Sequence, residues 1–83
     1  MAEEVAKKIL VIEDDDILGD IIVKKLKDEG YQTTLARDGE DGFEQIKKLR
    51  PDLVLLDIIL PKMSGYEILE ALRANPELTK TPV

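Results

Sequence analysis

The stretch Leu53-Val54-Leu55-Leu56-Asp57 decides the fold, because four apolar residues lead directly into an acid. A short apolar run without polar alternation is typical of a strand that is covered on both faces of a sheet. The same pattern occurs earlier, where Ile9-Leu10-Val11-Ile12 is followed by the acids Glu13 to Asp16. Residues Gln32 to Ala36 indicate a less apolar strand, which lies between these two runs in the sequence. The chain therefore offers three candidate strands.

Each candidate strand is followed by a segment whose apolar residues recur at helical spacing. These apolar positions are Ile17, Leu18, Ile21, Ile22 and Leu26 in the first segment, Phe43, Ile46 and Leu49 in the second, and Ile68, Leu69 and Leu72 in the third. Asp15 or Asp16 can cap the first helix, Gly30 can end it, and Asn75-Pro76 can end the third. Alternating strands and helices predict an α/β fold built on a parallel sheet.

The order of the strands follows from the handedness of their connections. Crossovers between parallel strands are right-handed. If the first helix covers one face of the sheet and the second helix covers the other, the strands lie in the order second, first, third. Ligands of such sheets bind at the carboxyl ends of the strands that flank the change in winding direction. Those two ends carry Glu13-Asp14 and Asp57. We therefore expect these acids to meet at one edge of the sheet.

Crowded carboxylates repel one another unless a proton or a cation neutralises them. Mg²⁺ suits such a site, because it binds a few carboxylates and keeps positions for water and phosphate oxygens. We expect Asp14 and Asp57 to bind Mg²⁺ directly and Glu13 to hold a coordinated water, with Asp57 as a nucleophile for a phosphoryl group. Two simpler interpretations stay open: Asp15 and Asp16 can serve only as helix caps, and Asp57 can be an ordinary turn residue.

Composition excludes several classes of protein. The 83-residue chain has a net charge of −6 and contains neither histidine nor cysteine. An acidic segment is unsuited to direct nucleic-acid binding, and without histidine there is no His-based general base, triad or zinc site. No apolar stretch approaches the length of a membrane span, and the acidic start Met1–Glu4 argues against a signal peptide or anchor. The lack of disulfides fits the reducing cytoplasm.

Two motifs resemble a known family. Ile9–Asp15 resembles the first strand and acid pair of the receiver domains of two-component response regulators. Leu53–Gly65, which reads Leu-Val-Leu-Leu-Asp-Ile-Ile-Leu-Pro-Lys-Met-Ser-Gly, resembles their phosphorylation strand and the loop after it. Together with Ala36–Glu40 and Thr81–Val83, the similarity covers essentially the whole chain.

The resemblance implies a function and a set of site residues. Receiver domains accept a phosphoryl group from a sensor histidine kinase on an aspartate, which corresponds to Asp57. The resemblance makes Asp14 a Mg²⁺ ligand, Glu13 the outer acid, and Ile59 the residue whose backbone carbonyl completes the metal site. It also implies a flavodoxin-like sheet with strand order 2-1-3, in which residues 1–83 form the amino-terminal part of a single receiver domain.

The chain departs from the family pattern after Val83. Receivers continue through two more strand–helix units, so this chain holds three of the usual five. The serine or threonine and the lysine that those units bring to the site cannot be assigned here, which predicts impaired phosphorylation. Without a neighbour, the apolar edge of Leu53–Leu56 invites pairing with another chain, so we expect a homo-oligomer.

Three functions are therefore compared. The first is a phospho-acceptor of a phosphorelay. The second is a receiver-derived half-domain that acts as an oligomerising assembly module without phosphotransfer. The third is a Mg²⁺-dependent phosphatase of the aspartyl-phosphate type, which is disfavoured because that class usually has a second acid two residues after the nucleophile, where this chain has Ile59. The expectation is that the chain is not an enzyme.

Overall fold

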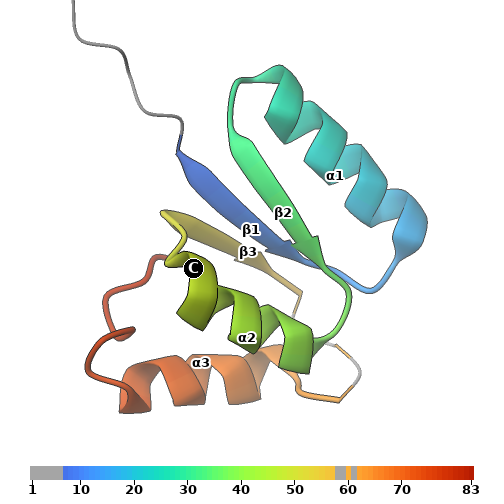
Figure 1. Ribbon diagram of the computed structural model, residues 1–83. Coiled ribbons are helices and arrows are strands. Elements are labelled where there is room, and N and C mark those ends of the chain that lie inside the picture. Colours follow the sequence, from blue (N-terminus) through green and yellow to red (C-terminus); the bar gives the residue numbers. More distant parts are fainter. Residues whose placement is uncertain (1–6, 58–59, 61) are drawn as a thin grey trace, which may run out of the picture.

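The computed structural model describes residues 7–57, 60 and 62–83 (Figure 1). Its strands β1 (Lys8–Ile12), β2 (Gln32–Ala36) and β3 (Leu53–Leu56) form one parallel sheet in the order β2-β1-β3. This order confirms the 2-1-3 prediction. The register places Ile12 opposite both Ala36 and Leu56, so the carboxyl ends of the three strands lie at one edge.

The three helices begin where short polar side chains cap them. Helix α1 (Asp16–Asp28) is capped by Asp15, whose carboxylate accepts a hydrogen bond from the backbone N–H of Leu18 at 2.8 Å. Helix α2 (Gly39–Leu49) is capped by Asp38 in the same way. Helix α3 (Gly65–Ala74) opens with a capping box made by Ser64 and Glu67. Among the described residues, no helix has the length and apolar character that a membrane crossing needs.

The hydrophobic core lies between the sheet and the helices α2 and α3. Alternate residues of a strand point to opposite faces, so Leu10 and Ile12 of β1 and Val54 of β3 face these helices. The fully buried members of the core are Leu10, Ile12, Ala36, Ile46, Val54, Ile68, Leu72 and Leu78. In Figure 1, α2 and α3 lie together on one side of the sheet and α1 lies on the other. Helices therefore lie on both faces of the sheet, but α1 covers β2 and β1. The prediction that Leu53–Leu56 is covered on both faces is wrong on the α1 side, where Leu55 is 36% exposed.

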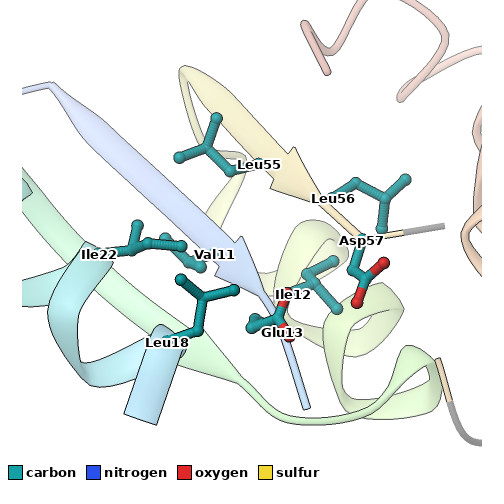
Figure 2. Close-up of a pocket in the computed structure, with 8 residues that line it drawn as sticks. All are labelled: Val11, Ile12, Glu13, Leu18, Ile22, Leu55, Leu56 and Asp57. Carbon is teal, nitrogen blue, oxygen red and sulfur yellow. The ribbon is translucent and has the colours of Figure 1, made fainter. Parts of the chain in front are cut away.

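Helix α1 is buried less than its apolar spacing predicted. Ile17 is 75% exposed and Ile21 is 59% exposed. The helix packs mainly over β2, where Gly19 approaches Leu35. An open groove of about 500 Å³ lies beside it, lined on its apolar walls by Val11, Leu18, Ile22 and Leu55 (Figure 2). In the described part of the chain, this side of β3 carries no helix, so part of the apolar face of α1 meets solvent.

The segment after α3 returns to the sheet. Leu78 enters the core, and the carbonyl of Pro82 accepts a hydrogen bond from the backbone N–H of Val54 at 2.9 Å. Pro82 thus lies against the outer edge of β3. The chain itself therefore occupies the first hydrogen-bonding position on the edge that was expected to be open, and in the described residues β3 remains the last strand on that side.

Candidate functional site

Three carboxylates meet where β1 and β3 end. Glu13, Asp14 and Asp57, here called the acid cluster, place carboxylate oxygens within 4.8 Å of one another. The backbone N–H of Asp57 donates to the carbonyl of Ile12 at 3.1 Å, which extends the pairing of β1 and β3 up to the acids. Figure 2 shows the side chains of Glu13 and Asp57 at the same end of the two strands. Glu13, Asp14 and Asp57 therefore meet at one edge of the sheet, as the predicted strand order implied.

Glu13 is held by its own backbone and by the start of α1. Its backbone N–H donates to the carbonyl of Ala36 at 3.0 Å, and its carboxylate accepts from the backbone N–H of Asp15 at 3.1 Å. Burial raises the pKa of Glu13, and the nearby charges of Asp57 and Asp14 raise it further, against the hydrogen bond from Asp15. The cluster is thus a place where negative charge is crowded and partly withdrawn from water.

The donor set fits a hard cation. Three carboxylates supply only oxygen ligands, which Mg²⁺ prefers. Asp14 is exposed while Glu13 and Asp57 are half-buried, so one side of the cluster is open to water or to a phosphate group. Ile59, whose carbonyl was expected to complete the metal site, lies outside the described residues.

Two basic side chains near this edge pair with acids outside the cluster. Arg37, which follows β2, forms ion pairs with Asp16 and with Asp20, the latter at 3.5 Å. Lys62, in the loop before α3, lies 3.6 Å from the carboxylate of Asp38. Both cations therefore have acid partners outside the cluster.

Sequence reasoning missed one feature of this region. Asp38 and Gly39, at the start of α2, contact Lys62 and Met63 in the loop before α3. A Cβ atom built on Gly39 would lie 1.6 Å from the carbonyl oxygen of Met63. The glycine itself was a signal that the backbone at this point approaches another segment closely.

Comparison with known proteins agrees with the geometry. The family model described as response regulator receiver domain matches residues 9–83. The DNA-binding response regulator MtrA of Mycolicibacterium smegmatis is 41% identical over 69 residues, which cover 83% of this chain and 30% of the relative. The probable transcriptional regulatory protein TcrX of Mycobacterium tuberculosis is 39% identical over 71 residues, covering 84% of this chain and 30% of the relative. The chain thus spans about a third of the length of these curated relatives.

Solved structures share the fold. The N-terminal domain of a response regulator receiver protein from Methanoculleus marisnigri superimposes with a TM-score of 0.87 at 38% identity, covering 93% of this chain and 63% of that one. The signal receiver domain of a signal transduction histidine kinase from Syntrophus aciditrophicus gives a TM-score of 0.88 at 33% identity, covering 94% and 59%. These matches confirm the flavodoxin-like receiver fold and the resemblance seen in the two motifs. The chain belongs to the response regulator receiver domain family.

Proposed function

We propose that this chain accepts a phosphoryl group on Asp57 in a two-component phosphorelay, with Glu13, Asp14 and Asp57 holding Mg²⁺. The observation that carries the proposal is the acid cluster itself: three carboxylates within 4.8 Å at the carboxyl edge of a receiver-type sheet. The strand order alone would bring Asp57 to the edge that carries Glu13 and Asp14, although Asp57 is distant from them in the sequence. A sensor histidine kinase is the proposed donor.

The proposed chemistry is the transfer of a phosphoryl group to a carboxylate. An oxygen of Asp57 attacks the phosphorus of a phosphohistidine, the P–N bond breaks, and the imidazole leaves with the electron pair of that bond and takes up one proton from water. The product is an acyl phosphate on Asp57 and a neutral histidine on the kinase. A Mg²⁺ ion at the cluster would offset the repulsion between the attacking carboxylate and the phosphoryl oxygens.

The residues of this chain orient the nucleophile. The hydrogen bond from the backbone of Asp57 to Ile12 holds the end of β3 against β1. The hydrogen bond from Asp15 to the carboxylate of Glu13 keeps that side chain beside Asp57. Both contacts restrict the positions of the acids before any ligand binds, which lowers the entropic cost of assembling the site.

The direct test uses a small phosphoryl donor. The chain is incubated with Mg²⁺ and acetyl phosphate, and its intact mass is measured. We expect a gain of one phosphoryl group that is lost in Asp57→Asn and when Mg²⁺ is removed by a chelator. The control is Asp28→Asn, which removes an exposed carboxylate at the far end of α1 and should be modified like the wild type. A wild-type chain that neither binds Mg²⁺ nor gains mass would contradict the proposal.

Self-association is proposed as a second property, and it is the basis of the alternative function as an assembly module. Leu55 on β3 is 36% exposed and lines the open groove beside α1. A second copy could cover this groove or pair with β3 beyond the position that Pro82 occupies. If phosphorylation fails while the chain forms a defined oligomer, the assembly module becomes the better explanation.

Direct nucleic-acid binding is not part of the proposal. MtrA is named as a DNA-binding protein, but this chain spans 30% of its length. The net charge of −6 opposes contact with the phosphate backbone of DNA.

A further inference from the structure

The short turn between β1 and α1 carries two of the three acids of the cluster, Glu13 and Asp14. At its β1 end, the backbone N–H of Glu13 donates to the carbonyl of Ala36, the last residue of β2, at 3.0 Å. At its α1 end, the carboxylate of Asp15 accepts from the backbone N–H of Leu18 at 2.8 Å. The position of the two acids therefore depends on how β2 and the first turn of α1 are placed relative to each other.

The first turn of α1 also touches the side chain of Glu13. The backbone N–H of Asp15 donates to the Glu13 carboxylate at 3.1 Å. A Cβ atom on Gly19 would lie 3.9 Å from Cγ of Glu13 and 3.2 Å from the side chain of Leu35 on β2. A displacement of this turn relative to β2 would thus move the groups that hold Glu13 in place.

Arg37 ties this turn to β2. It directly follows β2, and its guanidinium forms ion pairs with Asp16 and with Asp20, the latter at 3.5 Å. These two acids are four residues apart, so they lie one above the other on the same side of α1. A planar guanidinium presents several donors and can bind both carboxylates at once, which suits an ammonium group less well. Arg37 therefore grips the turn of α1 that contains Gly19.

The end of β2 thus holds both ends of the turn that carries the acids. The carbonyl of Ala36 binds the backbone of Glu13, and the side chain of the next residue, Arg37, binds α1. The Arg37 side chain is 48% exposed. Because exposed ion pairs contribute little to global stability, we expect variants of Arg37 to fold and their effect to be local, in the placement of the turn.

We propose that Arg37 is a positioning residue of the acid cluster: by binding Asp16 and Asp20 it fixes the first turn of α1 and thereby keeps Glu13 where the cluster can bind Mg²⁺. The proposal rests on the proposed function, in which the cluster binds that ion. Arg37 acts through α1 and the hydrogen bond from Asp15 to Glu13. Without it, the turn would have to be ordered when the ion binds, and that ordering would lower the affinity.

Two variants separate the position of the turn from the charge of Arg37. Arg37→Gln removes a positive charge from the acidic edge, which by itself would tighten cation binding. Arg37→Lys keeps the charge but lacks the planar group that spans two carboxylates. We expect the Mg²⁺ dissociation constant, measured by calorimetric titration, to rise about twofold to fivefold in Arg37→Gln and about twofold in Arg37→Lys, because residues that support metal ligands indirectly contribute to affinity. The positioning role is overturned unless the constant rises in both variants.

Arg50 offers a matched control. It forms a similarly exposed ion pair, in which its guanidinium lies 2.9 Å from the carboxylate of Glu77 and its side chain is 53% exposed. It precedes β3 and so lies near the opposite edge of the sheet from the acid cluster. Arg50→Gln and Arg50→Lys should change the dissociation constant by less than about 1.5-fold, because salt screens charges at that separation. Equal changes at positions 37 and 50 would overturn a role specific to Arg37.

A second measurement needs no metal ion. Amide hydrogen exchange of residues 13–19 should become about twofold to fivefold faster in Arg37→Gln, with exchange in α2 and α3 unchanged. In a chain that carries Asp16→Asn and Asp20→Asn, Arg37→Gln should cause no further acceleration, because the acids that Arg37 binds are already removed.

The two measurements distinguish failure of this proposal from failure of the proposed function. Unchanged exchange in residues 13–19, or further acceleration in the chain without the two acids, overturns the hold of Arg37 on α1, even when the wild type binds Mg²⁺. Faster exchange without weaker Mg²⁺ binding overturns the positioning role alone. A wild type without affinity for Mg²⁺ overturns the proposed function and the positioning role together, while exchange still decides whether Arg37 holds the turn.

Discussion

Glu13 and Asp57 follow different strands, yet their carboxylate oxygens lie within 4.8 Å of each other. The parallel pairing of β1 with β3 places Ile12 opposite Leu56, so the residues that come next extend from the same edge of the sheet. Burial, together with the charges of Asp57 and Asp14, raises the pKa of Glu13. The neighbouring acids therefore make it harder to ionise Glu13, and a cation bound as proposed would offset this effect.

Removing one of these charges should stabilise the metal-free protein. Two unit charges at the separation found in the cluster repel by about 1 kcal/mol in water-like surroundings. We expect Asp14→Asn to unfold at a higher temperature than the wild type when a chelator is present at low salt. Mg²⁺ should then raise the melting temperature of the wild type and have little effect on the variant. A lower melting temperature of Asp14→Asn in the chelator would contradict the repulsion.

Asp38 should make the stability of the protein depend on acid pH. The hydrogen bond from the backbone of Asp41 lowers the pKa of Asp38 below its ordinary value of 3.8, and the charge of Lys62 acts in the same direction. A lowered pKa in the folded state contributes stability above the ordinary pKa, and this contribution is lost as pH falls through the lowered value. Urea unfolding should show Asp38→Asn to be less stable than the wild type at neutral pH, with the difference shrinking below pH 3.8. A difference that stays constant down to that range would argue against the pKa shift.

The free energy of unfolding should depend on the residues of the inner face of α3 and change little with substitutions on its outer face. Ile68 is completely buried, whereas Tyr66 on the same helix is 65% exposed. Ile68→Ala should lower the free energy of unfolding by about 2–5 kcal/mol, because it removes apolar contacts and leaves a cavity. Tyr66→Ala should change it by about 0.5 kcal/mol or less. Similar losses for both variants in denaturant titrations would mean that the outer face of α3 is covered.

A charge at Leu55 should prevent self-association. Leu55 lies on β3 and lines the groove beside α1, so a lysine there would place a charge in any contact that covers the groove or extends the sheet. Light scattering after size exclusion should show a shift from oligomer to monomer in Leu55→Lys. Tyr66→Lys, which adds the same charge to the outer face of α3, is the control and should leave the oligomer intact. A wild type that is monomeric at micromolar concentration refutes the expected association.

The sequence by itself determined the elements, their order and the meeting of the acids. Gln32–Ala36 and Leu53–Leu56 were expected as strands and are strands, because apolar runs and the residues that end them act locally. The approach of Asp57 to Glu13 was predictable because the handedness of crossovers leaves few arrangements of three parallel strands. The assignment of Asp57 as the phosphoryl acceptor, and the role of Ile59, stay predictions.

Only the tertiary structure decided how these elements fit together. The helical spacing of Ile17 and Ile21 predicts an apolar face, but whether that face is buried depends on what else packs on the same side of the sheet. The contact of Gly39 with Met63 depends on the separation of two segments that are distant in the sequence, to a fraction of an ångström. Periodicity reports which residues share a face. It carries no information on how closely two faces approach, because that distance is set by the packing of all the side chains between them.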